Sequence, residues 1–540
     1  MDQNFDTIAN HEIGRIASVN GSHLVVVLNP EPGTGHRPMY SAVPKGTLVK
    51  IINPRGWVYG LITAASIPMP NRERGDAEMV FAEVVMLGEV ELDQAGPAER
   101  RFQRGVSLFP SVGDLVFRGS AEDLAIVYAR PSLSCVRIGT IHQDQTIHAY
   151  VVPDLLLGKH FAILGSTGSG KSCATALILR RVLEAHPRAH IVVLDPHNEY
   201  AAAFPDFAEV VGSNSLDLPY WLYNFEEIST IIFGNHSEEA DKLREARLLD
   251  DLIVKAKNAF SGNLQKASQV TANTPVPYRI ADLINFLDTE MGRLSQNANI
   301  APFLSLKAKI ERIRNDPKFK FSFGGISTYD NMSKVLGRLL RIPVNGKPMT
   351  IIDLSAIPSE ALNTVVSVIC RIAFDFAAYS TRPMPILLVC EEAHRYLPAN
   401  AGDGARAQQH ILSRIAKEGR KYGLSLGIVS QRPSDLAMSA LSQCNTILAL
   451  RLSSQVDQDF VRAMLPDWGG ELLDFLPSLR NAEAIIVGEG VPVPARVQFD
   501  SLPPQQLPRG ATARFSSAWQ EESNDPTAVD AVIHRWRNEH

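Results

Sequence analysis

The sequence predicts an α/β fold in which a parallel sheet, interrupted by a bundle of helices, follows a smaller β-rich domain. Three observations support this prediction. Residues 1–145 contain short runs rich in Val and Ile, separated by turn-forming residues, as in a small barrel or sandwich. From residue 146 apolar runs alternate with helical stretches, as in βαβ units. Between residues 236 and 342 only helical periodicity remains.

The composition is that of a globular chain and excludes several classes. Of 540 residues, 45% are hydrophobic and 21% are charged, and a net charge of -5 argues against non-specific coating of nucleic acid. The five cysteines are dispersed without a CxxC pair, which favours reduced thiols in a cytoplasmic protein over a disulfide framework or a zinc site. The N-terminus is polar and acidic, and Arg371 and Asp375 interrupt the longest apolar run, so we expect neither a signal peptide nor a membrane span.

The β-rich domain carries no cluster of residues suited to catalysis. Its expected strands are 13–19, 23–28, 47–53, 57–63 and 79–87. No constellation of His, Cys or acidic residues stands out among them. We therefore expect a docking or assembly module here.

The predicted core falls into two parts, 146–235 and 343–490, on either side of the insertion. Its expected strands are 160–165, 190–195, 348–354, 385–392, 424–431, 445–452 and 482–488, with a helix from Lys171. The insertion, residues 236–342, is expected to contain three or four helices.

The chain ends in a Pro-rich, polar tail, 491–540, with a terminal amphipathic helix. Asp525 followed by Pro526 is a strong helix start. One face of this helix would be apolar, with Val529, Val532, Ile533 and Trp536. A helix of about four turns is marginal alone in water, so this face should pack on its own domain or on a neighbouring subunit.

One segment fits the phosphate-binding pattern G-x-x-x-x-G-K-[ST]. It consists of Gly165, Ser166, Thr167, Gly168, Ser169, Gly170, Lys171 and Ser172. The segment follows an apolar strand and opens a helix, which are the two contexts that a P-loop needs. Backbone N–H groups and the helix N-terminus would face the phosphates of ATP, Lys171 would reach the β- and γ-phosphates, and the hydroxyl of Ser172 could ligate Mg²⁺.

Two adjacent acids end a later apolar run. A P-loop site needs an acid at the end of a neighbouring strand to orient Mg²⁺ and a base to position water. Glu391 suits the first role, directly or through a metal-bound water, and Glu392 the second. Asp195 follows another strand, and Gln431 follows a third, where it would either sense a γ-phosphate or water or simply cap the strand.

Two basic segments have two interpretations each. Arg414 and Arg420 lie in a basic helix end that is either solvated or supplies an arginine finger to a neighbouring subunit. The segment 307–320 has six basic and two acidic residues, and it is either a solvated helix face or a contact for phosphate backbones.

Together, these motifs resemble the HerA family of hexameric ATPases, in the HerA/FtsK branch of P-loop motors. The matching stretches occur in family order at 101–114, 159–172, 193–200, 390–398, 416–423, 428–436 and 449–452. The resemblance implies a RecA-like P-loop core with a helical-bundle insertion, preceded by a HAS-barrel-like domain. Lys171, Ser172, Glu392 and Gln431 occupy the family's motif positions, and Asp195 matches a family aspartate.

The resemblance also implies an activity and partners. It implies an ATP- and Mg²⁺-dependent translocase that forms a homo-hexamer and threads double-stranded DNA through its pore. A NurA-like nuclease or a defence effector, such as a sirtuin-like NADase or another nuclease, would dock on the barrel, for DNA end processing or anti-phage defence. The alternative is a nucleotide-gated ring that mainly assembles and activates such an effector. An ABC-type transporter ATPase is disfavoured, because no LSGGQ-like signature lies between the P-loop and the paired acids.

Two positions depart from the family pattern. The family commonly has Asp where Glu391 stands, so a shifted metal or an intervening water must absorb the extra methylene. It often has Arg where this chain has Lys159, a position that would bind the cofactor if it clamps a phosphate. Lysine keeps the charge but loses the bidentate fork of arginine.

Overall fold

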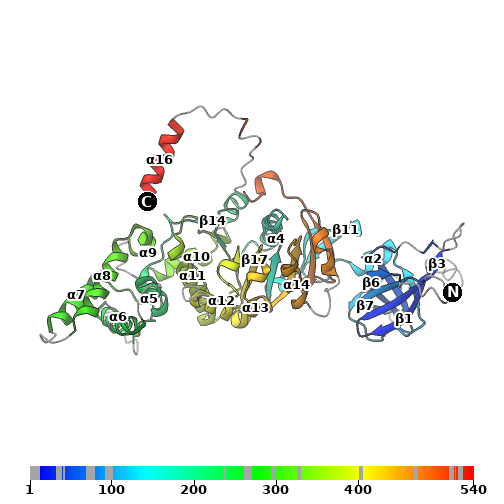
Figure 1. Ribbon diagram of the computed structural model, residues 1–540, viewed down its shortest axis with the longest axis horizontal. Helices are drawn as coiled ribbons and strands as arrows, with labels where there is room; N and C mark the ends of the chain where they lie inside the picture. Colours follow the sequence, from blue (N-terminus) through cyan, green and yellow to red (C-terminus); the bar gives the residue numbers. More distant parts are fainter. Residues whose placement is uncertain are drawn as a thin grey trace.

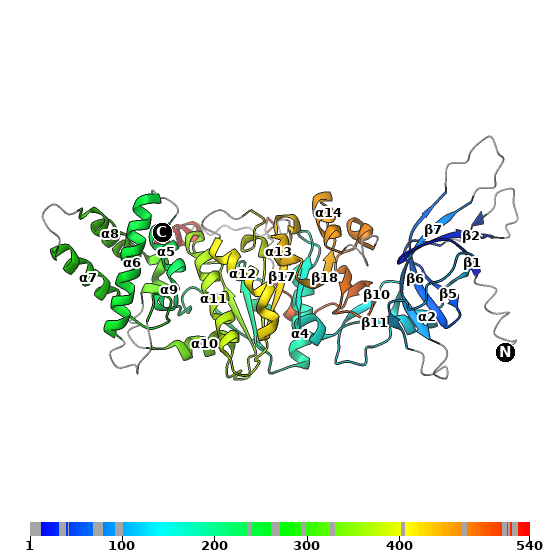
Figure 2. The ribbon, with the colours of Figure 1, turned by 90° about the horizontal axis from the view of Figure 1, so that it is seen from below.

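The molecule is elongated. The computed structural model describes residues 12–31, 39–40, 43–67, 79–91, 101–234, 239–260, 270–293, 299–324, 330–400, 406–465, 472–509, 516, 519–520 and 527–539. A β-barrel lies at one end, a sheet-based core in the middle and a helical insertion at the other end (Figures 1 and 2). This arrangement confirms the predicted fold class.

The barrel closes because β2 pairs with both β1 and β7. Its strands are β1 (Glu12–Asn20), β2 (His23–Leu28), β5 (Leu48–Asn53), β6 (Gly56–Ser66), β7 (Phe81–Glu91) and β9 (Leu115–Arg118). They pair in the order β2-β1-β9-β5-β6-β7, with the two-residue β8 (Gln103–Arg104) added to β7 and a separate ribbon of β3 (Pro30–Glu31) and β4 (Met39–Tyr40). Val26, Val49 and Ile51 fill the interior, since none exposes any surface.

The predicted limits of the barrel and of the tail were wrong. After α2 (Ala121–Val127), the strands β10 (Val136–Ile141) and β11 (Asp144–Val151) leave the barrel and join the core sheet, so the boundary at residue 145 falls inside β11. β10 pairs with β20 (Ala495–Phe499), which the sequence assigned to the tail. Pro492 and Pro494 precede β20 without interrupting it. These strands pair over more than 350 residues of sequence, so no local pattern shows the pairing.

The core is a mixed sheet with a parallel centre. Its other strands are β12 (His160–Leu164), β13 (Ile191–Asp195), β14 (Ala208–Val211), β15 (Met349–Asp353), β16 (Ile386–Cys390), β17 (Leu424–Ser430), β18 (Cys444–Leu450) and β19 (Glu483–Gly488). The order is β11-β10-β20-β19-β18-β12-β17-β16-β13-β15-β14, parallel from β18 to β14 and antiparallel on the other side. The carboxyl ends of β12, β13, β16 and β17 therefore meet at one edge, where ligands of open α/β sheets bind.

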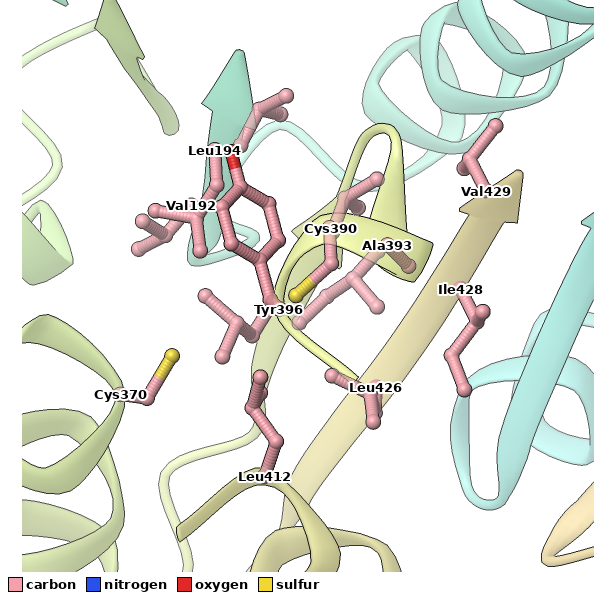
Figure 3. Close-up of a cluster of buried hydrophobic side chains, with 14 of the residues drawn as sticks. Val192, Leu194, Cys370, Cys390, Ala393, Tyr396, Leu412, Leu426, Ile428 and Val429 are labelled. Carbon is pink, nitrogen blue, oxygen red and sulfur yellow. The ribbon is translucent and has the colours of Figure 1, made fainter. Parts of the chain in front are cut away.

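Helices cover this sheet and bury its strands. They are α3 (Pro153–Leu157), α4 (Lys171–Ala185), α11 (Ser359–Tyr379), α12 (Arg406–Glu418), α13 (Met438–Leu441) and α14 (Gln455–Met464). Figure 3 shows part of the core that results, where side chains from β13, β16, β17, α11 and α12 gather around Tyr396. Within the described residues, α11 alone is long and apolar enough to cross a membrane by length and composition, and 67% of its apolar window is buried in the protein.

The helical segment between β14 and β15 contains α5 (Phe225–Phe233), α6 (Glu239–Phe260), α7 (Ile280–Arg293), α8 (Ala301–Asn315), α9 (Lys320–Phe323) and α10 (Met332–Leu340). α5, which the sequence placed in the core, packs against α11 of the core and against α6 and α8 of the insertion, so it joins the two parts. Buried Glu227 of α5 accepts hydrogen bonds from Arg371 of α11 at 2.9–3.1 Å, which ties the insertion to the core.

The predicted C-terminal helix is present as α16 (Thr527–Glu539), and it stands away from the core sheet (Figure 1). Asp525 and Pro526, which the sequence assigned to its start, lie outside the described residues. Val529, Val532 and Trp536 are 62%, 55% and 65% exposed. The three described apolar side chains are thus not buried within this chain.

Candidate active site

The P-loop connects β12 to α4 at the carboxyl edge of the sheet. Gly168 and Gly170 have φ values of +76° and +99°, which side chains rarely adopt, so glycine is required at both turns. Among the residues that the structure describes, no side chain caps the N-terminus of α4. Its first N–H groups therefore remain available to an anionic ligand, as a phosphate site requires.

Neighbouring strand ends hold the P-loop in place. The Thr167 hydroxyl donates a hydrogen bond to the side-chain oxygen of Gln431, directly after β17. The N–H of Ser166 donates to the carbonyl of Arg451 at 2.9 Å, and the carbonyl of Ser169 accepts from Ala482 at 3.0 Å. The structure thus brings Gln431 to the P-loop, where the first of its two interpretations requires it.

Lys171 links the P-loop to both predicted acids. Its Nζ lies 2.8 Å from Oε1 of Glu391 and 3.0 Å from Oε1 of Glu392, and all three side chains are almost fully buried. Burial lowers the pKa of Lys171, but the two carboxylates outweigh this effect and hold the pKa above its ordinary value. Burial also raises the pKa of Glu391, against the opposing charge of Lys171. Lys171 thus forms one cluster with two adjacent acids that lie more than 200 positions further along the chain.

The backbone explains how two adjacent acids reach the same lysine. β16 ends at Cys390, so neither acid obeys the alternation of a strand. Glu392 has φ +51°, in the left-handed region that is uncommon for residues other than glycine. This turn brings its carboxylate to the same side as that of Glu391. Strained conformations of this kind concentrate at functional sites.

His394 and Ser430 extend this cluster, although the sequence assigned them no role. The Nδ1 of His394 lies 3.1 Å from Oγ of Ser430 and 3.2 Å from Oε2 of Glu392. The latter oxygen is buried and makes no hydrogen bond to any residue that the structure describes. Burial lowers the pKa of His394. Among the described residues, one oxygen of Glu392 thus remains without a hydrogen-bond donor.

Asp195 organises the loop that follows β13. It is fully buried, and its carboxylate accepts hydrogen bonds from the N–H of His197 at 3.2 Å and from that of Tyr200 at 2.9 Å. The hydroxyl of Tyr200 donates to Oε2 of Glu391 at 2.6 Å. The sequence placed Asp195 at the cofactor, and the structure places Tyr200, quoted only as part of the motif, against the paired acids.

The two candidate arginine fingers differ in their surroundings. Arg414 pairs with Glu418 at 3.4 Å and stacks on the ring of Phe374 at 4.5 Å, so its own chain engages it. Arg420 is exposed, and its guanidinium makes no hydrogen bond or ion pair within the described part of the chain. It borders a cavity of about 700 Å³ that is also lined by the first residues of β13, β16 and β17. Arg420 thus lies at the sheet edge opposite the P-loop.

Lys159 is not brought to its own P-loop. It precedes β12, whereas the P-loop follows this strand, and its Nζ pairs with Glu489. Its backbone carbonyl accepts a hydrogen bond from Ser425, the second residue of β17, at 2.7 Å. Binding of Lys159 to the nucleotide of its own subunit is therefore excluded, because the length of β12 separates the two.

The site has the oxygen donors that a P-loop uses for Mg²⁺. Within the described ranges no group of three or more His, Cys, Asp or Glu residues could hold a metal by themselves. Mg²⁺ at phosphate sites takes one or two protein oxygens and completes its shell with phosphate and water. The hydroxyl of Ser172 at the start of α4 and the carboxylate of Glu391 fit this small donor set.

The sequence matches known proteins along most of its length. Residues 136–373 match the family described as helicase HerA, central domain. The chain is 28% identical over 463 residues to the DNA double-strand break repair helicase HerA of Pyrococcus furiosus, covering 79% of this chain and 78% of that protein. It is 25% identical to a probable DNA double-strand break repair helicase HerA of Methanocaldococcus jannaschii, covering 71% and 79%.

The chain is thus similar to the HerA family, both in its central domain and along most of its length. With the P-loop lysine and both acids in one cluster, the protein is an ATP-hydrolysing enzyme. A solved structure of VirB4 of Thermoanaerobacter pseudethanolicus has the same fold, with a TM-score of 0.50 at 15% identity, covering 70% of this chain and 98% of VirB4. The resemblance drawn from the sequence motifs is thereby confirmed.

Proposed function

We propose that this protein is a ring-forming ATPase that translocates double-stranded DNA. The cluster of Lys171, Glu391 and Glu392 is the observation that carries the catalytic half of the proposal. The names of the relatives, which are DNA double-strand break repair helicases, support duplex DNA as the substrate. The five free cysteines support a reducing, cytoplasmic location.

The residues at the P-loop divide the work of hydrolysis. Lys171 leaves the two acids and binds the β- and γ-phosphates, since phosphate oxygens compete for its ammonium group. Glu392, released from Lys171, accepts a proton from the attacking water through its unused oxygen. Gln431 accepts a hydrogen bond from Thr167 of the P-loop, so its side chain shifts when the γ-phosphate binds there. When bound, Mg²⁺ neutralises phosphate charge, and Ser172 and Glu391 would hold it.

The site is completed by a neighbouring subunit. Arg420 lies at the sheet edge opposite its own P-loop and has no partner within the described chain, which suits a finger that acts on the next subunit's nucleotide. Head-to-tail contacts of this kind close into rings, and we propose the family's hexamer. The exposed apolar face of α16 would dock on a neighbouring subunit and help hold the ring together.

DNA-dependent hydrolysis tests the motor. We expect duplex DNA to stimulate the ATPase rate several-fold, whereas an equal concentration of a neutral polymer does not. The Lys171→Ala variant is the matched control for contaminating ATPases, because it removes the phosphate-binding ammonium group. A rate that is lost in the Lys171→Ala variant but does not respond to DNA would exclude a DNA-driven motor and leave the ATPase assignment intact.

A second candidate function is a nucleotide-gated scaffold for an effector enzyme. The barrel supports it, because the loop between β8 and β9 exposes Leu108, Phe109 and Val112, at 37%, 51% and 66%. Asn53 of β5 donates a hydrogen bond to the carbonyl of Leu108, so Ile52, 37% exposed, is close to the same surface. An exposed apolar patch of this kind is typical of a protein interface. A NurA-like nuclease or a sirtuin-like effector is the partner we propose.

Capture of partners from the native host distinguishes the two functions. Mass spectrometry should identify a nuclease or an NAD-consuming enzyme that co-purifies with the full-length protein. The double variant Phe109→Ser, Val112→Ser should lose this partner and keep its ATPase rate, because both side chains lie in the barrel loop between β8 and β9, whereas the P-loop connects β12 to α4. Retention of the partner by this variant would exclude the barrel surface.

A further inference from the structure

Tyr200 contacts the candidate metal-binding acid from the side opposite Lys171. Its side chain is fully buried, and its hydroxyl donates a hydrogen bond of 2.6 Å to Oε2 of Glu391. The other oxygen of Glu391, Oε1, accepts from Lys171 at 2.8 Å. Within the described residues, these two groups are the hydrogen-bond partners of the Glu391 side chain. Each oxygen of the carboxylate thus has its own donor.

The hydroxyl of Tyr200 is fixed by the sheet. β13 ends at Asp195, whose carboxylate accepts the N–H groups of His197 and Tyr200 and so holds the loop between them. Asn198 takes a left-handed conformation, φ +53°, inside this loop. The N–H of Glu391 donates to the carbonyl of Leu194 at 3.2 Å, so the two strand ends that carry the pair are bonded to each other. Donor and acceptor therefore sit on one rigid support.

When nucleotide binds, Glu391 loses its hydrogen bond from Lys171 and keeps the one from Tyr200. This step rests on the proposed function, in which Lys171 moves to the phosphates. Oε1 is then released, while the bond from Tyr200 to Oε2 remains. A glutamate has one more rotatable bond than the aspartate common in the family, and an untethered carboxylate would lose entropy on binding a cation. A buried donor on one oxygen removes that freedom and leaves the other oxygen facing the phosphate side.

We propose that Tyr200 is a positioning residue that fixes the Glu391 carboxylate for the divalent cation of bound ATP. Asp195 has a supporting role, since it folds the loop that places Tyr200. Partners of metal ligands act in this way in other proteins, where their loss typically reduces metal affinity or activity about 10–100-fold.

The test compares two tyrosine variants by metal binding instead of activity. Tyr200→Phe removes the hydroxyl and keeps the ring. Tyr396→Phe is the matched control, because Tyr396 is also buried beside β13 and β16 (Figure 3) and its hydroxyl has no hydrogen-bond partner within the described residues. Mn²⁺ binding is measured by electron paramagnetic resonance at a saturating concentration of a non-hydrolysable ATP analogue. Binding of the analogue without metal, and the melting temperature, are measured in parallel.

We expect Tyr200→Phe to weaken Mn²⁺ binding about 10-fold or more, and to leave metal-free binding of the analogue unchanged. Tyr396→Phe should bind Mn²⁺ as the wild type does. Glu391→Asp should also weaken Mn²⁺, and adding Tyr200→Phe to it should cost little more, because the shorter carboxylate no longer reaches the hydroxyl. This cycle isolates the contact between the two residues.

Two other outcomes separate the inference from the function on which it rests. If Tyr200→Phe binds Mn²⁺ as tightly as the wild type while Glu391→Gln does not, Tyr200 has no positioning role and the ATPase site stands. If Glu391→Gln itself leaves Mn²⁺ binding unchanged, the assignment of Glu391 fails, and the inference fails with it. An equal loss of Mn²⁺ affinity in Tyr200→Phe and Tyr396→Phe would mean that core packing, and not the hydrogen bond to Glu391, causes the loss. This result would also overturn the inference.

Discussion

Replacing Arg420 by alanine tests whether the active site is shared between subunits. Strand β17 runs from Leu424, near Arg420, to Ser430, beside the P-loop. Its seven residues span about 20 Å at 3.3 Å per step, which no arginine side chain bridges. Arg420 therefore cannot reach the nucleotide of its own subunit. If it serves the next one, Arg420→Ala should still bind ATP but lose hydrolysis.

The size of the expected loss in ATPase rate follows from the role of Arg420 as an arginine finger. Arginine fingers contribute about 10³–10⁵ to the rate, or about 4–7 kcal/mol of transition-state stabilisation. Arg414→Ala is the matched control, since Arg414 stacks on Phe374 and pairs with Glu418 in its own chain. It should alter stability slightly and leave most of the ATPase rate.

Mixed rings supply the decisive assay. Arg420→Ala subunits retain the P-loop, and Lys171→Ala subunits retain the finger. When the two are mixed equally, about one quarter of head-to-tail interfaces pair an intact P-loop with an intact finger. Hydrolysis should therefore rise well above that of either variant alone. No recovery, despite subunit exchange confirmed by native mass spectrometry, would refute the reasoning, and so would a near wild-type rate in Arg420→Ala alone.

Three further predictions concern the metal, the ion pair of Glu227 with Arg371 that joins the insertion to the core, and the ring. Glu391→Gln should raise the Mg²⁺ concentration needed for half-maximal nucleotide binding, seen by calorimetry; an unchanged Mg²⁺ dependence would contradict its role. Glu227→Ala leaves buried Arg371 without its carboxylate and should cost about 3–5 kcal/mol in urea unfolding, whereas a cost below 1 kcal/mol would show that the joint is not buried in solution. Deleting residues 525–540 should dissociate the ring on dilution to nanomolar concentration with an unchanged circular dichroism spectrum, and a ring that survives would exclude docking by α16.

Local patterns predicted much of this fold, and long-range pairing limited the rest. The P-loop is contiguous, and its strand and helix are direct neighbours, so residues 159–185 could be read from sequence alone. By contrast, β10 and β20 pair although the whole core sequence lies between them, and neither strand carries a motif. Helix α5 was missed because a short apolar helix does not differ from a core segment by periodicity.

The candidate site shows the same limit. Strand-end acids and a P-loop predicted the cluster of Lys171 with Glu391 and Glu392, because carboxyl ends of parallel strands share an edge. The hydrogen bond of Tyr200 could not be predicted, since it depends on how a loop folds over Asp195. The position of Lys159 at the far end of β12 from its own P-loop could not be predicted either, because charge and motif position do not tell at which end of a strand a residue lies.

The Glu392→Gln variant tests the central claim most directly. Glutamine keeps the size and shape of the side chain, but its amide cannot accept a proton from water. A single-turnover experiment with radiolabelled ATP measures binding and cleavage in the same sample. We predict that ATP binds at the wild-type level and that cleavage slows by about 10²–10⁴-fold. Cleavage within a few-fold of the wild-type rate would show that Glu392 is not the base and that the cluster with Lys171 has another purpose.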